Sequence, residues 1–155
     1  MKIGVCGSRS ITDRDEVYRH LDMFTNRDSG GVFDNYTILS GGAKGVDQLA
    51  KDWADLNLFD HVLFKPYHMV DTDAEYKVRY FFARNKQILD NADQVLILWD
   101  GKSNGTKWCI DYLRKWRKSS DYTIITMEPT DNGNGKEEEG WSGRSEGQAS
   151  SGQEA

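Results

Sequence analysis

Residues 36–54, YTILSGGAKGVDQLAKDWA, combine a strand, a glycine-rich turn and a helix in immediate succession. The apolar run at 37–39 predicts a short strand, and the glycines after it predict a turn. Apolar residues then recur at helical spacing and predict a helix over about 45–56: Val46, Leu49, Ala50 and Trp53. A strand that leads through a turn into a helix is the building unit of parallel α/β sheets.

The same alternation continues on both sides of this unit. Further strands are predicted at about 2–6, 61–64, 94–99 and 122–126. Helices are predicted from Thr12 or Asp13 to the stop at 28–31, from 71 to 91, and from the turn at 100–105 to about 118. The nearly continuous apolar strands at 2–6 and 94–99 fit burial on both sides. We therefore predict an α/β fold that is Rossmann-like and doubly wound, with a mostly parallel five-stranded sheet and helices on both faces.

Composition divides the chain into a folded domain over 1–129 and an acidic polar tail over 130–155, which we expect to be disordered. Trp141 is the only large apolar residue of that tail. Residues 131–155 hold six acids and two bases, so of the net charge of −5 they carry −4 and leave −1 for residues 1–130. A nearly neutral body argues against an extensive contact with a nucleic-acid backbone.

The chain has two cysteines and three histidines. Two cysteines do not make a disulfide framework, and Cys6 is predicted to be a small buried residue. The histidines show no metal-ligand spacing, so no metal site is predicted. No apolar run approaches membrane-spanning length, which predicts a cytoplasmic protein without a membrane partner.

Three turns rich in glycine and serine follow predicted strands, at 7–9, 40–43 and 100–106. In an open parallel sheet, ligands bind beyond the carboxyl ends of the strands, where these turns meet. Helix N-termini bind anions through free N–H groups, glycine allows close approach, and the hydroxyls of Ser40, Ser103 and Thr106 could add hydrogen bonds. Small residues and helix-capping residues are common in any turn between a strand and a helix, but three such turns at one edge of the sheet favour a phosphate-bearing ligand. GxxxxGK[ST] and GxGxxG after the first strand are both absent, which disfavours an ordinary NTPase or NAD dehydrogenase.

Three charged residues near these turns have two interpretations each. Asp47 could stabilise the helix dipole, or it could bind a ribose hydroxyl or orient the glycine turn. Arg84 could reach a phosphate from a cleft edge or lie on a solvated helix face. Asp100 could contact ribose or a base, or cap the turn that follows it.

Four blocks occur in order: GSRSITD, LSGGAKGVDQLAKDWA, ARNKQILDNADQVLILWDG and SNGT. Together they resemble the SLOG superfamily, and within it the YspA-type (cpYpsA-related) family, over roughly residues 1–127. The resemblance implies a Rossmann-like domain that binds a nucleotide or nucleotide-derived ligand. The turns and the resemblance together give these expected ligand-binding residues: Gly7, Ser8, Arg9, Ser40, Gly41, Gly42, Ala43, Gly45, Asp47, Arg84, Asn85, Asp100, Gly101, Ser103, Gly105 and Thr106.

Two relatives within the superfamily imply different activities. LOG-type phosphoribohydrolases use an arginine in a similar helix, which Arg84 matches, and an acid shortly after a PGGxGT turn. Here Trp108 and Cys109 stand where that acid is expected and Asp111 is out of step, which counts against this glycosidase activity. DprA binds single-stranded DNA through a similar GSR…SG-A-GID…RN pattern, but such binding usually needs a positive groove and stacking aromatics.

The predicted function is binding or sensing of a nucleotide or nucleotide derivative such as ADP-ribose, without any cofactor that the sequence identifies. One alternative is a hydrolase of an N-glycosidic or phosphate bond with Asp47 or Asp100 as acid–base group. Single-stranded DNA binding is the weaker alternative. An aromatic helix face with Trp108, Tyr112 and Trp116 would permit a homo-oligomer.

Overall fold

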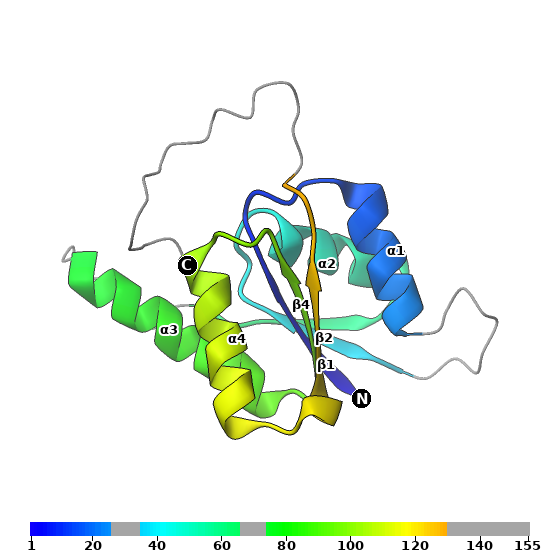
Figure 1. The fold of residues 1–155 in the computed structure, drawn as a ribbon. Coiled ribbons are helices and arrows are strands. Elements are labelled where there is room, and N and C mark those ends of the chain that lie inside the picture. Colours follow the sequence, from blue (N-terminus) through cyan, green and yellow to red (C-terminus); the bar gives the residue numbers. More distant parts are fainter. Residues whose placement is uncertain (26–34, 66–73, 130–155) are drawn as a thin grey trace.

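The computed structural model describes residues 1–25, 35–65 and 74–129. Strands and helices alternate along it as predicted (Figure 1). The elements are β1 (Lys2–Gly7), α1 (Arg14–Phe24), β2 (Thr37–Ser40), α2 (Val46–Leu56), β3 (Asp60–Leu63), α3 (Ala74–Asn91), β4 (Gln94–Trp99), α4 (Asn104–Trp116), a short 3-10 helix (Ser119–Asp121) and β5 (Tyr122–Thr126). The expected tail with Trp141, the stop at 28–31 and the helix start at 71–73 lie outside the described residues.

The five strands form one sheet in the order β3-β2-β1-β4-β5, and every neighbouring pair is parallel. The predicted Rossmann-like α/β fold is therefore confirmed, with a sheet that is parallel throughout. The chain builds outward from β1 to β3 and then crosses back to place β4 on the other side of β1. Ligands bind where the strand order reverses in such sheets, so the β1–β4 junction is the first place to look for a site.

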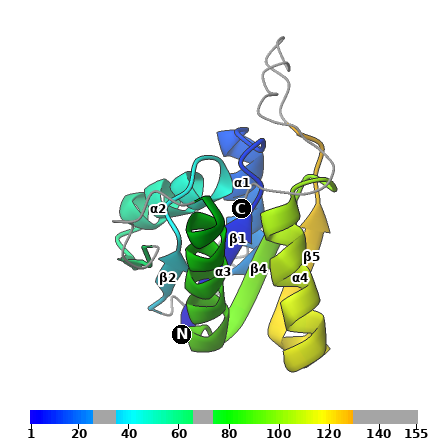
Figure 2. The same ribbon diagram turned by 90° about the vertical axis from the view of Figure 1, so that its left-hand side faces the viewer.

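Helices cover both faces of the sheet (Figure 1, Figure 2). Residues of α1 and α2 pack on one face, with Val17, Leu21 and Trp53 in one buried cluster. Residues of α3 and α4 pack on the other face, with Ile88 and Leu113 in a second buried cluster. Side chains of β4 enter both clusters, as expected for a strand covered on both sides.

Helix α1 shows how local sequence sets an element's ends. The Asp13 carboxylate accepts a hydrogen bond from the Glu16 N–H at 3.2 Å, so Asp13 rather than Thr12 is the N-cap. The helix ends at Phe24, earlier than the predicted stop at 28–31. The Thr25 hydroxyl donates to the Leu21 carbonyl at 2.8 Å and satisfies a carbonyl of the last turn.

The aromatic face of α4 is only partly exposed. Trp108 stacks on Phe82 of α3, with ring centroids 5.1 Å apart and 9° between the planes, and on Tyr112 at 5.3 Å. Trp108 and Tyr112 are half-buried, whereas Trp116 is 62% exposed. No helix within the described ranges is both long enough and apolar enough to cross a membrane.

Candidate functional site

The turns after β1 and β4 meet at the carboxyl edge of the sheet, where a small cavity opens. It is lined from four elements and their turns by Cys6, Gly7, Ala43, Asp47, Arg84, Asn85, Gly105, Thr106 and Cys109. Its volume is about 20 Å³, which holds about one water molecule. A nucleotide is much larger, so only a small group such as a phosphate oxygen could enter while the rest of the ligand lay outside.

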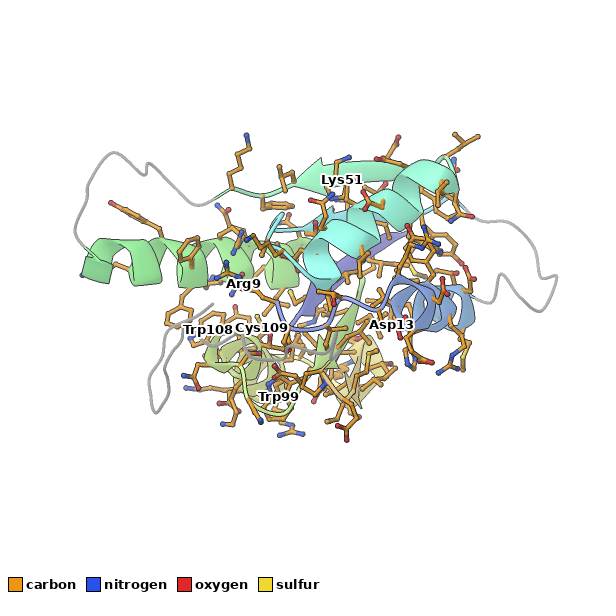
Figure 3. The ribbon with its side chains drawn as sticks, turned by 90° about the horizontal axis from the view of Figure 1, so that it is seen from above. Arg9, Asp13, Lys51, Trp99, Trp108 and Cys109 are labelled. Atoms are coloured by element: carbon orange, nitrogen blue, oxygen red, sulfur yellow. The ribbon has the colours of Figure 1, made fainter. Side chains whose placement is uncertain are left out.

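The structure brings seven of the predicted residues to this cavity and places the others around it. Figure 3 looks onto the carboxyl edge and shows Arg9 over the middle of it. Arg9 and Gly42 are exposed, while Ser8, Ser40, Gly41 and Gly45 are buried. Asp100, Gly101 and Ser103 belong to the turn before α4. Cys6 and Cys109 also line the cavity and were missed as site residues, since neither belongs to a glycine turn.

Asp47 is buried in the first turn of α2. One carboxylate oxygen, Oδ2, accepts hydrogen bonds from the Gly41 and Ala43 N–H groups, both at 3.2 Å. Asp47 therefore holds the glycine turn in place. Two of the backbone N–H groups that the sequence suggested for phosphate binding are thus already engaged by a carboxylate.

The environment of Asp47 also changes its acidity. Burial raises the pKa of its carboxyl from 3.8 to about 6, although the Arg84 charge, the two N–H groups and Arg9 act in the opposite direction. A carboxyl with a pKa near neutrality, next to a cavity, is suited to general acid–base chemistry.

Arg84 is 5% exposed, which excludes a solvated helix face. Its Nε donates to Asn85 Oδ1 at 2.9 Å, and its Nη1 donates to the Gly41 carbonyl at 2.7 Å and the Phe64 carbonyl at 3.4 Å. In the part of the chain that the structure describes, Nη2 has no hydrogen bond and no carboxylate forms an ion pair with this guanidinium. A buried cation without a contacting anion is unfavourable, so this site favours a negatively charged guest.

The N-terminus of α4 lies across the cavity from Arg84. Gly105 and Thr106 occupy its first turn, where backbone N–H groups lack partners within the helix. Thr106 is 4% exposed, and no described residue bonds its hydroxyl. A guanidinium, helix N–H groups and a free hydroxyl around one cavity form an anion-binding arrangement.

A second polar cluster fixes the turn before α4 to the turn after β1. The buried Ser8 hydroxyl contacts the Ser103 hydroxyl at 2.8 Å and accepts from the Asp100 N–H at 2.9 Å. Asp100 Oδ1 accepts from the N–H groups of Lys102 and Ser103, and Oδ2 accepts from the Ser10 hydroxyl at 2.6 Å. Both oxygens of Asp100 are therefore used to hold loops together, which weakens its candidacy as an acid–base group.

Two of the predicted residues act as spacers. A Cβ at Gly7 would lie 2.5 Å from Val46 Cβ, so glycine there lets α2 approach β1. Gly45 has φ +78° and lies against the backbone of the turn after β1. Both glycines serve the close contact between that turn and α2, which brings Asp47 to the cavity.

Ser40 has a different surrounding from the one predicted. Its hydroxyl is fully buried and contacts His61 Nε2 of β3 at 2.9 Å. Burial is the main cause that lowers the pKa of His61, the Lys51 charge adds to it, and the Asp55 charge opposes it. Ser40 thus supports the β2–β3 pairing and does not line the cavity. Among the described side chains, no three His, Cys, Asp or Glu are grouped so that they could hold a metal ion.

Comparisons with known proteins give a family match and a similar solved structure. No curated protein matches the chain. The X-ray structure of DNA processing protein A (DprA) from Streptococcus pneumoniae is similar, with 16% sequence identity and a TM-score of 0.46. The likeness covers 81% of this chain and 58% of that chain. The model of the YspA, cpYpsA-related SLOG family matches residues 1–68, which run from β1 through β3 and include the glycine turn with Asp47, so the resemblance to this family is confirmed over these residues.

Proposed function

We propose that this protein binds a phosphate-bearing nucleotide or nucleotide derivative, such as ADP-ribose, at the carboxyl edge of its sheet. The observation that carries the proposal is the buried guanidinium of Arg84, which has no ion-pair partner among the described residues. Arg84 Nη2 and the Thr106 hydroxyl, neither of which bonds a described residue, supply donors for one phosphate group.

The proposed phosphate position differs from the one that the sequence alone suggested. Since the Gly41 and Ala43 N–H groups bond Asp47, we place the phosphate between Arg84 and the first turn of α4. The rest of the ligand would lie over the cavity, where the exposed side chains of Arg9, Lys44 and Lys102 are available.

Calorimetric titration with AMP, ADP-ribose, NAD and a short single-stranded oligonucleotide tests this function. We expect micromolar binding of AMP or ADP-ribose, because a charged, desolvated phosphate contact combined with base and ribose contacts supports affinities of about that order. Binding of the oligonucleotide alone, with a steep loss of affinity in salt, would contradict the proposal and favour a nucleic-acid function.

Hydrolysis of the bound ligand is a second candidate, and Asp47 is the observation that favours it. Its carboxyl lines the cavity, its Oδ1 has no hydrogen bond with a described residue, and its pKa of about 6 permits proton transfer near neutral pH. The same titration mixtures are assayed for free base, ribose phosphate and inorganic phosphate. Product release that Asp47→Asn abolishes, with binding retained, would establish an enzyme; intact ligand in every mixture would leave a binding or sensing protein.

A further inference from the structure

Two cysteines that lie far apart in the sequence line the same cavity. Cys6 is in β1 and Cys109 is in α4, and both belong to the buried cluster on the α3–α4 face of the sheet. Cys6 is 7% exposed and Cys109 is 1% exposed, and neither forms a disulfide. Figure 3 shows the position of Cys109 on α4.

The two thiols line the same cavity and belong to the same buried cluster. A hydrogen bond with Cys109 is the main cause that raises the pKa of Cys6 well above its ordinary value, and burial adds to it. Cys6 is therefore a protonated thiol at neutral pH, and it must lose its proton before it can react with an oxidant. Both thiols also line a cavity of about 20 Å³, which is far too small for a bulky thiol reagent.

Their position links them to the proposed anion site. Cys6 directly precedes Gly7, and Cys109 follows Thr106 by one helical turn on the same face of α4. A bond between the two sulfurs would tie the carboxyl end of β1 to the α4 turn that carries Gly105 and Thr106.

We propose that Cys6 and Cys109 are a site of oxidative modification, at which a peroxide converts the two thiols into an intramolecular disulfide. One thiol loses its proton and its thiolate attacks one oxygen of hydrogen peroxide; the O–O bond breaks, a sulfenic acid forms, and the leaving hydroxide takes up the proton and departs as water. The second thiol then attacks that sulfur, the S–S bond forms, and a second water leaves. The two sulfurs lose two electrons in total, and the peroxide gains them.

A consequence for ligand binding rests on the proposed function. The disulfide alters the cavity wall next to Thr106, so oxidation changes the affinity for AMP. A reductant such as dithiothreitol restores it, because the bond is reversible.

The experiment treats the full chain with hydrogen peroxide and then counts thiols and measures mass under denaturing conditions. The expected result is loss of both titratable thiols, a mass decrease of two hydrogens, and a monomeric band on a non-reducing gel. Cys6→Ser and Cys109→Ser, treated identically, cannot show that mass decrease. Two thiols that remain titratable, oxygen addition without a disulfide, or a disulfide between two chains would each overturn the proposal.

AMP titrations of reduced and oxidised protein test the consequence separately. A changed affinity that dithiothreitol restores, and that Cys109→Ser no longer shows on peroxide treatment, supports it. Equal affinities before and after disulfide formation would overturn the consequence. Absence of binding of both AMP and ADP-ribose in the reduced protein would overturn the proposed function and leave the disulfide result standing, because mass and thiol counts need no ligand.

Discussion

Replacing Gly45 by alanine tests whether the close contact between the turn after β1 and the start of α2 holds the site together. Gly45 has φ +78° and ψ −129°, a conformation that is nearly confined to glycine and costs an L-residue about 1–3 kcal/mol. The new Cβ would also lie 2.6 Å from the Ser8 carbonyl oxygen and 2.7 Å from Arg9 Cα. These are backbone atoms of a turn fixed by hydrogen bonds, so they cannot move away as a flexible side chain would.

The chain offers a matched control at Gly101. Its φ of +84° is also positive, but a Cβ there would meet nothing closer than Thr126 Cγ2 at 4.0 Å. Gly101→Ala therefore carries a conformational cost of about 1–3 kcal/mol without a steric overlap. Gly45→Ala adds a packing cost of about 1–3 kcal/mol for the overlap, giving about 2–6 kcal/mol in total.

Urea unfolding followed by far-UV circular dichroism measures both free energies of unfolding. We expect Gly45→Ala to lose clearly more stability than Gly101→Ala, out of a total of about 5–15 kcal/mol for a domain of this kind. Equal losses in the two variants would refute the reasoning, because they would show that the turn after β1 adjusts to the added methyl group without cost.

Two further predictions concern buried polar groups. Because the pKa of Asp47 is raised to about 6, the folded protein holds its proton more tightly than the unfolded chain, and ionisation lowers stability as the pH rises from about 4 to 6. The free energy of unfolding of Asp47→Asn, relative to that of wild type, should therefore rise by up to about 3 kcal/mol between pH 4 and pH 7, as measured by urea unfolding across that range. A difference between the two proteins that does not change with pH would contradict the burial argument. Ser8→Ala removes the contacts with Ser103 and the Asp100 N–H and should lower the free energy of unfolding by about 1–3 kcal/mol. It should also speed up amide hydrogen exchange in the turn before α4. Unchanged exchange there would argue against the cluster as the link between the two turns.

Much of the fold follows from local sequence. The alternation of apolar strands with amphipathic helices predicts a parallel sheet, and β4 and β5 begin and end at the predicted residues. That the glycine turns share one edge then follows from the parallel sheet itself, because every βα turn lies at its carboxyl end. Strand order is not encoded locally, and the meeting of β1 with β4 becomes visible only in the structure.

The sequence indicated which turns lie at this edge of the sheet, but not how their side chains are arranged. Arg84 and Gly41 lie far apart in the chain, and no local pattern shows that the guanidinium bonds this carbonyl. Similarly, the raised pKa of Asp47 results from tertiary burial, and the occupation of two N–H groups by its carboxylate depends on side-chain geometry. One signal for Cys109 existed in the sequence: it lies one helical turn after Thr106 and thus on the same helix face.

The central claim is that a phosphate binds between Arg84 and the first turn of α4, and Thr106→Val tests it most directly. Valine has the shape of threonine without the hydroxyl, and that hydroxyl has no partner among the described residues, so the free energy of unfolding should not fall. Calorimetric titration with AMP compares wild type, Thr106→Val and the control Thr123→Val, whose threonine is exposed on β5. We predict that Thr106→Val binds AMP about 10- to 100-fold more weakly, the loss of one hydrogen bond to a charged group, whereas Thr123→Val binds as wild type does. Equal affinity in all three proteins would contradict the proposed phosphate position, and no AMP binding by wild type would contradict binding of a mononucleotide at this site.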